Sequence, residues 1–268
     1  MDLAYSAGFE SYGTRLLLRS NDKDTLDDLI MVTRSALLGD LRPCKSGTYQ
    51  LVLDLVGSKD NYEVFRNAEL ITKGRIDPYS SRYLNALIRL SVAEFSRHLV
   101  FLHAGAVGWK GKGIVLPAMS FQGKSTLVYE LVKLGAEYYS DDFAILDAKG
   151  RLHPFPRDIS LRSRHSDGEP HEIDPQLIGA TVGSGKIPVG LIFLTRYKPR
   201  SHWAPKRVSR GEGIFDLLPF TLPIRQKPHL ALEVLNTAAA PAVIAKSMRA
   251  DAKIAAKRLL EFFDKVTF

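Results

Sequence analysis

Cysteine is nearly absent from this chain of 268 residues, in which Cys44 is the only one. A single cysteine cannot form an internal disulfide, which fits a reducing compartment and excludes a small secreted domain held by cross-links. Hydrophobic residues nevertheless make up 45% of the sequence, which is enough for a sizeable core. We therefore expect one large domain or two modest ones that fold without covalent staples.

Long hydrophobic runs are also missing. No apolar stretch approaches the roughly 20 residues of a membrane-spanning helix. Residues 1–13 contain Asp2 and Glu10 and no apolar segment of the kind found in signal peptides. Internal repeats and low-complexity tracts are absent as well. These absences predict a cytoplasmic protein without a membrane partner.

Negative charge is the scarcer sign, because 37 Lys and Arg residues face 29 Asp and Glu residues, for a net charge of +8. This balance suits an anionic ligand without selecting one. A basic tract over residues 196–210 includes Trp203, a combination that nucleic-acid-binding proteins use. No recognised nucleic-acid module accompanies the tract, so a basic rim around an ATP or acidic-substrate site is favoured over nucleic acid.

Residues 1–98 have the pattern of a small α+β region. Strands are expected over residues 12–19, 49–56 and 62–67. A helix is expected over residues 24–38, and Asp77 followed by Pro78 is typical of a second helix start. This region contains no recognisable site chemistry, so packing, contacts in a homo-oligomer and substrate recognition all remain open as its role.

Residues 99–268 change to short apolar strands with glycine-rich joints, the pattern of an α/β domain. Strands are expected over residues 99–102, 114–116, 137–140, 143–147, 151–155, 189–195 and 242–245. Helices are expected over residues 126–134, 213–220 and 228–237, with a last helix capped by Asp251 that carries Ile254, Leu259, Phe262 and Phe263 on its apolar side. Residues 163–188 are polar and dotted with glycine, which is typical of a lid or mobile loop, and Lys186 is a candidate phosphate contact there.

The segment around which this domain is organised is residues 118–126, Ala-Met-Ser-Phe-Gln-Gly-Lys-Ser-Thr. A strand, then a loop, then a helix that opens with Gly-Lys-Ser is the layout of a phosphate-binding P-loop. Backbone N–H groups at the helix start would hold an anion, Lys124 would reach the terminal phosphates, and the Ser125 hydroxyl would bind Mg²⁺. The predicted nucleotide-binding residues are Ser120, Phe121, Gln122, Gly123, Lys124, Ser125 and Thr126.

Two positions of this segment depart from the usual pattern G-x-x-x-x-G-K-[ST]. Ala118 replaces the first glycine, and Phe121 stands where many such loops carry glycine. A non-glycine residue at a position that needs a positive φ costs roughly 1–2 kcal/mol. The segment is therefore read either as a phosphate cradle of altered shape or as an ordinary Gly-Lys-Ser helix start.

Asp141 and Asp142 follow the strand expected over residues 137–140. The carboxyl ends of strands face the ligand crevice in such folds, where one carboxylate can hold Mg²⁺ and another can accept a hydroxyl proton. An Asp-Asp pair taken alone is more often a solvated turn. Lys124 shortly upstream favours the catalytic interpretation.

Other candidate residues are weaker. His103 either is a hydrogen-bonded core histidine or lies near Asp141 and tunes it. His165 and His171 flank Asp167 and Glu169, but their spacing matches no known metal motif. Each of Arg157, Arg162 and Arg164 is either a surface arginine or a residue that neutralises charge in the transition state.

Four segments together resemble the HPr kinase/phosphorylase superfamily. They are residues 103–107, the loop 118–126, residues 139–142 with Gly135 before them, and Pro-Phe-Pro-Arg at 154–157. Within this superfamily the sequence is most similar to the HPr-kinase-related proteins often found beside peptide-modification genes. The resemblance is close over residues 99–161 and extends to the rest only in layout.

The resemblance implies a P-loop nucleotide-binding core of the HPr kinase/PEP carboxykinase type over residues 99–268, with ATP and Mg²⁺ as cofactors. It implies that Asp141 is the base toward the acceptor hydroxyl, that Ser125 and Asp142 serve Mg²⁺, and that His103 supports the phosphoryl-transfer centre with Lys124.

The function predicted from the sequence is an ATP-dependent kinase that phosphorylates a serine-like hydroxyl of a peptide, protein or small molecule. The alternative, motivated by Ala118 and Phe121, is a degenerate nucleotide-binding protein that regulates or scaffolds without phosphotransfer. A GTPase or a transporter-type ATPase is disfavoured, since neither an Asn-Lys-x-Asp motif nor a transporter signature is present.

Overall fold

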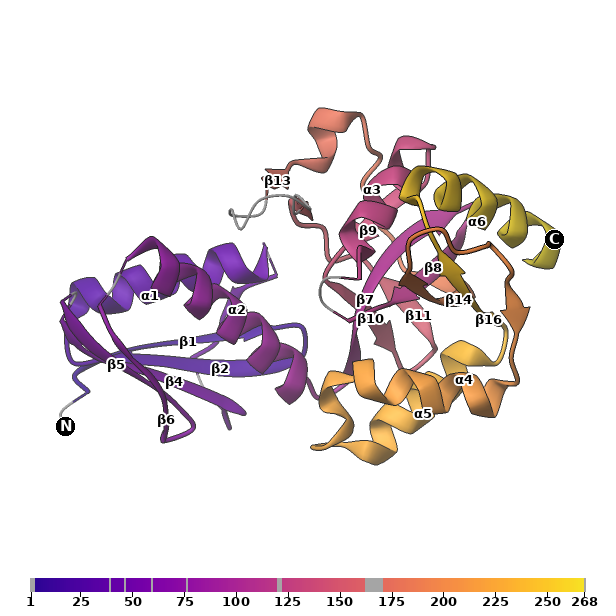
Figure 1. The fold of residues 1–268 in the computed structure, drawn as a ribbon. Coiled ribbons are helices and arrows are strands. Elements are labelled where there is room, and N and C mark those ends of the chain that lie inside the picture. The colour runs from indigo at the N-terminus through magenta and orange to yellow at the C-terminus, as the bar shows by residue number, and fades with distance from the viewer. Residues whose placement is uncertain are drawn as a thin grey trace. The chain divides into compact units, whose positions relative to one another are not determined.

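The computed structural model describes residues 3–38, 40–45, 47–58, 60–75, 77–119, 122–161 and 171–267. The chain divides into two compact units, Met1–Leu99 and Val100–Phe268 (Figure 1). Both units contain a sheet and helices, which confirms the predicted mixed α/β class. Within the described ranges, none of the helices combines the length and the apolar character needed to cross a bilayer.

The first unit is built on a six-stranded sheet of order β3-β1-β2-β4-β5-β6. β1 and β2 form an antiparallel hairpin, β2 and β4 are parallel, and β4, β5 and β6 form an antiparallel meander. The strands are β1 Tyr5–Ser11, β2 Thr14–Ser20, β3 Arg42–Pro43, β4 Leu51–Ser58, β5 Asn61–Arg66 and β6 Glu69–Gly74.

Two helices pack on this sheet, and both begin at an aspartate cap. The side chain of Asp22 accepts the Thr25 N–H before α1 (Lys23–Leu37). Asp77 accepts the Ser80 N–H at 2.7 Å before α2 (Pro78–Phe95), and the Ser80 hydroxyl accepts the Asp77 N–H in return. The predicted start of α2 is therefore confirmed. Apolar side chains from both helices and from β1, β2, β4 and β5 form one core.

The second unit is built on an eight-stranded sheet whose main path is β11-β10-β7-β8-β14-β16-β15, with β9 paired to β7. β8 pairs in parallel with β14, and β14 pairs in parallel with β16. The strands are β7 Leu99–Trp109, β8 Lys112–Pro117, β9 Glu137–Ser140, β10 Phe143–Asp147, β11 Arg151–His153, β14 Ile187–Tyr197, β15 Lys206–Arg207 and β16 Val243–Arg249. β12 Ile159–Leu161 and β13 His171–Ile173 form a separate pair.

Helices cover both faces of the second sheet because its central strands alternate apolar residues between two cores. α3 (Lys124–Lys133) and α6 (Ala252–Thr267) belong to one core, and α4 (Arg210–Leu217) and α5 (Pro228–Ala239) belong to the other. Neighbouring residues of β14 show the alternation, since Leu191 contributes to the α3 side and Ile192 to the α5 side. Short 3₁₀ turns occur at Pro175–Ile178, Leu218–Phe220 and Leu222–Ile224.

Several boundaries differ from the sequence predictions. β1 and β6 were not foreseen, and Tyr12 lies in the turn between β1 and β2 because its positive φ of 44° ends the strand. β7 continues to Trp109, whereas the predicted strand ended at residue 102. Asp251 does cap α6, since its carboxylate accepts the Ile254 N–H at 3.1 Å, but Ile254 itself is 57% exposed.

Candidate functional site

The predicted loop and the aspartate pair emerge at the same edge of the second sheet. β8, β14 and β16 are parallel, so their carboxyl ends at Pro117, Tyr197 and Arg249 share this edge. β9 is antiparallel to β7, which is antiparallel to β8, so β9 also ends there. The strand topology thus brings residues 118–123 and residues 141–142 to one side of the sheet.

The loop between β8 and α3 is described at Ala118, Met119, Gln122 and Gly123, whereas Ser120 and Phe121 lie outside the described residues. Ala118 is buried and is not among the residues with a positive φ, so alanine is accommodated there without left-handed strain. Gly123 adopts φ 75° and ψ 26°, the left-handed conformation that glycine adopts at little cost.

Within the described residues, the N-cap position of α3 supplies no side-chain acceptor for the first N–H groups of this helix. Gly123 is its N-cap residue and makes no side-chain cap bond, and the first turn of α3 has no acidic residue. The first N–H groups of a helix need an acceptor from elsewhere when no cap supplies one, and the helix dipole favours an anion. Ser125 and Thr126 lie in this first turn and are partly buried.

Lys124 connects the helix start to the aspartate pair. Its Nζ donates a hydrogen bond to the backbone oxygen of Asp142 at 3.3 Å. The close packing of α3 on β7 depends on Gly105, because a Cβ there would lie 2.5 Å from Val128 Cγ2 and 3.3 Å from Lys124 Cγ. The lysine stem is therefore held directly over β7.

The turn between β9 and β10 is fixed by Ser140. Its hydroxyl accepts hydrogen bonds from the N–H groups of Asp142 and Phe143, each at 3.1 Å. The Asp142 carbonyl also accepts the Ala104 N–H at 3.2 Å, in addition to Lys124. Two elements thus hold the Asp142 backbone, β7 from one side and the lysine from the other.

The two aspartates differ in exposure. Asp141 is only 5% exposed, and its two carboxylate oxygens accept from the Tyr138 hydroxyl at 3.2 Å and from the Ser160 N–H at 3.1 Å. Asp142 is partly exposed. A carboxylate has about four acceptor positions, so Asp141 can accept further hydrogen bonds while both donors stay in place.

Burial and charge around Asp141 shift two neighbouring groups. Burial, with the negative charge of Asp141, raises the pKa of Tyr138 far above its usual range, so its hydroxyl stays a donor. Burial lowers the pKa of Arg157, against the opposing effects of Glu172 and then Asp141. Of the three candidate arginines, Arg157 is therefore close enough to Asp141 to interact electrostatically, while Arg162 and Arg164 lie outside the described residues.

His103 lies on β7 next to the aspartate turn. Its ring is partly buried and meets the ring of Phe143 at 6.4 Å between centroids and an interplanar angle of 62°. Ala104, the next residue, pairs with Pro117 on one side and bonds the Asp142 carbonyl on the other. His103 thus lies between the loop and the aspartates.

Ser125 and Asp142 carry oxygen atoms of the kind that Mg²⁺ prefers. Mg²⁺ is usually held by one or two carboxylates together with substrate phosphates rather than by a cage of protein ligands. Ser125 follows Lys124 directly, and Asp142 supplies a partly exposed carboxylate beside the lysine contact. Among the described residues no group of three or more His, Cys, Asp or Glu side chains gathers into a metal cage.

Other predicted residues lie elsewhere. His165, Asp167 and Glu169 fall outside the described residues, and His171 is exposed on β13. Lys186 is exposed, and its positive charge contributes to the lowered pKa of His153, which burial lowers most. The Asp147 carboxylate lies 3.0 Å from His153 Nε2. Asp147 ends β10 and Asp142 precedes it, so this cluster is roughly 15 Å along the strand from the aspartate pair.

The prediction of a long loop over residues 163–188 is wrong for its described part. Besides β13 and a 3₁₀ turn, this part pairs with β9, since Thr181 O accepts the Tyr138 N–H at 2.7 Å and Tyr138 O accepts the Gly183 N–H at 2.9 Å. The backbone N–H and C=O groups of Tyr138 on the edge of β9 are the partners of this segment. The segment is therefore docked on the sheet next to Tyr138.

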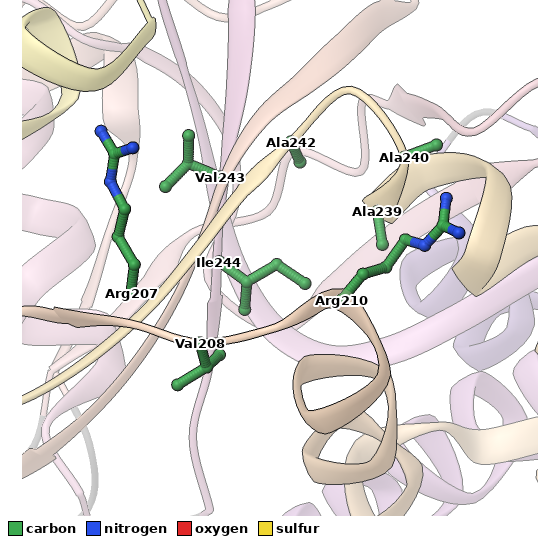
Figure 2. A pocket seen from close by; sticks show the side chains of 8 residues that line it. All are labelled: Arg207, Val208, Arg210, Ala239, Ala240, Ala242, Val243 and Ile244. Atoms are coloured by element: carbon green, nitrogen blue, oxygen red, sulfur yellow. The ribbon is translucent and has the colours of Figure 1, made fainter.

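A hollow of about 390 Å³ lies in another part of the second unit (Figure 2). Figure 2 shows Arg207 and Arg210 at its two sides and Val208 and Ile244 between them. None of Lys124, Asp141 and Asp142 lines it, so it is separate from the candidate site. Trp203 of the same basic tract stacks on Phe193 with ring centroids 5.1 Å apart, so this aromatic ring is engaged within the protein.

Three residues that shape this edge are not predicted by the sequence patterns. Tyr138 and Ser160 bond the Asp141 carboxylate, and Arg249 bonds the loop. Tyr138 lies only three positions before Asp141, but the alternation of side chains along a strand does not predict that its hydroxyl contacts the Asp141 carboxylate. The contact of Arg249 with the loop depends on the parallel order β8-β14-β16, which cannot be predicted from the sequence.

Comparison with known proteins gives little beyond this geometry. No protein-family model matches the chain, and no curated protein matches it. Among solved structures, the chain is similar to the Hpr(Ser) kinase/phosphatase from Coxiella burnetii, with a TM-score of 0.31 and 13% identity over 62% of this chain and 96% of that one. At this TM-score and identity the likeness carries no conclusion about function.

Proposed function

We propose that this chain is an ATP-dependent kinase of the HPr-kinase-related type, which transfers the γ-phosphoryl group to a serine-like hydroxyl of a peptide, protein or small molecule. The hydrogen bond from Lys124 Nζ to the Asp142 carbonyl carries the proposal. It joins an uncapped helix start and an acidic pair at one sheet edge. Kinases use a lysine at the phosphates and carboxylates for Mg²⁺ and for the acceptor hydroxyl, which are the groups that this edge offers.

In this proposal each residue has a defined task. N–H groups and side chains of residues 120–126 hold the phosphates, and Lys124 lies at the terminal phosphate. The acceptor hydroxyl gives its proton to Asp141, whose carboxylate Tyr138 and Ser160 keep in place. Ser125 and Asp142 would hold Mg²⁺, which offsets negative charge on the phosphate oxygens. His103 supports the same centre from β7.

The burial of Asp141 favours a second candidate function, a nucleotide-binding protein that does not transfer phosphate. A carboxylate that is 5% exposed and already accepts two hydrogen bonds can be a structural acceptor in the turn. In that case the edge would bind ATP as a signal, and Asp141 would act only in folding.

The test is phosphotransfer from γ-labelled ATP with Mg²⁺ to a cell extract that supplies the acceptors. We expect wild-type protein to label an acceptor, and Lys124→Ala and Asp141→Asn to lose labelling by roughly 100-fold or more. Lys133→Ala, on the exposed end of the same helix, and Asp158→Asn, an exposed aspartate, are the matched controls and should keep it.

The outcome separates the two candidates. Labelling that survives in Asp141→Asn discards Asp141 as the base. ATP binding by wild-type protein without labelling of any acceptor supports the second candidate.

A further inference from the structure

Arg249, the last residue of β16, reaches the candidate phosphate loop. This arginine is only 2% exposed. Its Nη2 donates one hydrogen bond to the carbonyl oxygen of Gln122 at 3.1 Å and another to the carbonyl oxygen of Gly123 at 2.6 Å. These partners lie 127 and 126 positions earlier in the chain. The contact therefore exists only because β8 and β16 are both parallel to β14 and end at one edge.

These two hydrogen bonds act on the direction of the backbone N–H groups at the start of α3. In a planar trans peptide the C=O and the N–H point in opposite directions. The carbonyl of Gln122 points to Arg249, so the N–H of Gly123 points away from it. The carbonyl of Gly123 also points to Arg249 and accepts the Leu127 N–H at 3.1 Å as the first bond of α3, so the helix and Arg249 together direct the N–H of Lys124 away. Both N–H groups belong to the uncapped start of α3.

We propose that Arg249 is a positioning residue for nucleotide binding. It holds the carbonyls of Gln122 and Gly123 inward so that the N–H groups of Gly123 and Lys124 face the phosphates. This inference rests on the nucleotide site of the proposed function. The guanidinium also places a positive charge behind the helix start, which adds to the attraction for an anion.

The guanidinium is itself held in place. Its Nη1 donates to the Ala250 carbonyl at 3.4 Å, and its Cζ lies 5.9 Å from the ring centroid of Tyr197. The backbone carbonyl of Arg249 accepts the Lys198 N–H at 2.9 Å. Because the guanidinium is fixed, the loop carbonyls that it holds are also fixed before a ligand arrives. The loop then loses little conformational freedom on binding, which is the condition for a preorganised anion site.

The left-handed Gly123 is matched to this arginine. A Cβ at position 123 would lie 2.6 Å from Arg249 Nη2, in addition to the strain of φ 75°. Glycine thus serves two purposes, since it permits the turn and lets the guanidinium approach the carbonyls.

The alternative is that Arg249 only fastens the loop to the sheet for stability. The two roles differ in what they predict for folded protein. A fastener changes the melting temperature and leaves the affinity of the folded molecules for nucleotide unchanged. A positioning residue changes the dissociation constant for ATP·Mg²⁺ at temperatures where circular dichroism shows the variant to be folded.

The experiment is calorimetric titration of ATP·Mg²⁺ into wild-type, Arg249→Met, Arg249→Lys and Arg258→Met proteins. Arg258 is an exposed arginine of α6, so its replacement by methionine is matched in charge and size. We expect Arg249→Met to weaken binding roughly 10- to 100-fold, the effect of losing two charge-assisted hydrogen bonds. Arg249→Lys keeps the charge but lacks the planar group whose Nη1 bonds Ala250 while Nη2 faces both carbonyls, so its loss should be smaller. Arg258→Met should bind as wild type.

Added guanidinium ion at millimolar concentration should restore part of the affinity of Arg249→Met, because it can fill the vacated space and donate to both carbonyls. If Arg249→Met does not fold, Arg249→Lys decides the question, with a loss of fivefold or more as the supporting result. Wild-type affinity in the folded Arg249 variants overturns the inference and leaves the proposed function intact. A wild-type chain that binds no ATP overturns both, and one that binds ATP but transfers no phosphate overturns the proposed function alone.

Discussion

The helices of the first unit and α3 of the second unit begin in opposite ways. α1 and α2 start at Asp22 and Asp77, whose carboxylates accept N–H groups of their own first turns. α3 starts at a left-handed glycine, without a side-chain cap and with a lysine as its first residue. Capped starts are satisfied within the chain, whereas the start of α3 has N–H groups and positive charge to offer to an external anion.

Under the proposed function, this difference assigns binding to α3 and stability to the capped helices. The aspartate caps of the first unit are worth about 1 kcal/mol each in folding. The second unit forgoes such a cap at α3 and instead holds the carbonyls of this helix start with Arg249. Variants that exchange the two kinds of helix start should therefore affect stability in one unit and nucleotide affinity in the other.

The largest effect is expected when α3 is given a carboxylate of its own. Thr126→Asp places a negative charge in the first turn, where it should stabilise the helix by about 0.3–1 kcal/mol. The same charge would face the phosphates, and like-charge contact of several kcal/mol corresponds to ATP binding at least roughly 100-fold weaker. Titration calorimetry and thermal melting measure the two effects, and Thr126→Asn is the neutral control. Unchanged ATP affinity in Thr126→Asp would contradict an anion site at this helix start.

A second variant moves α3 without changing charge. Gly105→Ala puts a methyl group 2.5 Å from Val128 Cγ2, which should cost about 1–3 kcal/mol of stability and shift Lys124. We expect ATP binding to weaken by roughly tenfold. Adding Val128→Ala removes the obstructing atoms, so the double variant should recover part of both losses. A double-mutant cycle measured by denaturation and titration should show coupling between the two sites, and strict additivity would mean that α3 does not rest on Gly105.

Removal of a helix cap in the first unit should lower stability and leave ATP affinity unchanged. Asp77→Ala takes away the acceptor of the Ser80 N–H, so the free energy of unfolding should fall by about 0.5–2 kcal/mol, while ATP affinity stays at the wild-type value. Denaturant unfolding and calorimetry test both statements. Asp27→Ala, an exposed position of α1, should change stability by less than about 0.5 kcal/mol. A large drop in ATP affinity for Asp77→Ala would break the separation of the two units.

The smallest effect concerns the support of Asp141 and depends on pH. The pKa of Tyr138 is raised above its ordinary value of 10.0 in the folded protein, because burial and Asp141 disfavour the phenolate. Above that ordinary value the unfolded chain loses this proton while the folded chain keeps it, so the stability contribution present below pH 10 is lost as pH rises. Tyr138→Phe should therefore show a shallower alkaline loss of stability than wild type, and should be about 0.5–1.5 kcal/mol less stable at neutral pH.

Alkaline denaturation curves of wild type, Tyr138→Phe and the exposed-site control Tyr83→Phe give this comparison. Tyr83→Phe should follow the wild-type curve. Identical slopes for wild type and Tyr138→Phe would mean that the Tyr138 hydroxyl is not buried against Asp141.

Much of the fold was predictable because local signals are strong in this chain. The Asp77-Pro78 helix start, β9 at residues 137–140 and β10 at residues 143–147 all follow from capping and apolar runs. β6 was missed because its pattern is polar and half exposed, so alternation gives little contrast. The docking of residues 181–183 on β9 was missed because it depends on a sheet edge formed elsewhere in the chain.

The candidate site was predictable in its residue types and not in its support. Gly-Lys-Ser after a strand and Asp-Asp after the next strand point to one sheet edge by the rules of α/β folds. The hydrogen bonds of Tyr138 to Asp141 and of Arg249 to Gly123 depend on side-chain direction and on pairing across distant strands. These contacts can be learned only from the folded chain.

The most direct measurement is the affinity of the folded protein for ATP·Mg²⁺ by titration calorimetry, with Lys124→Ala beside Lys133→Ala. The account predicts saturable binding by wild type and by Lys133→Ala, and a loss of roughly 100-fold or more in Lys124→Ala. Equal affinity of the two lysine variants, or absence of binding in the wild type, would show that the open start of α3 does not receive a nucleotide.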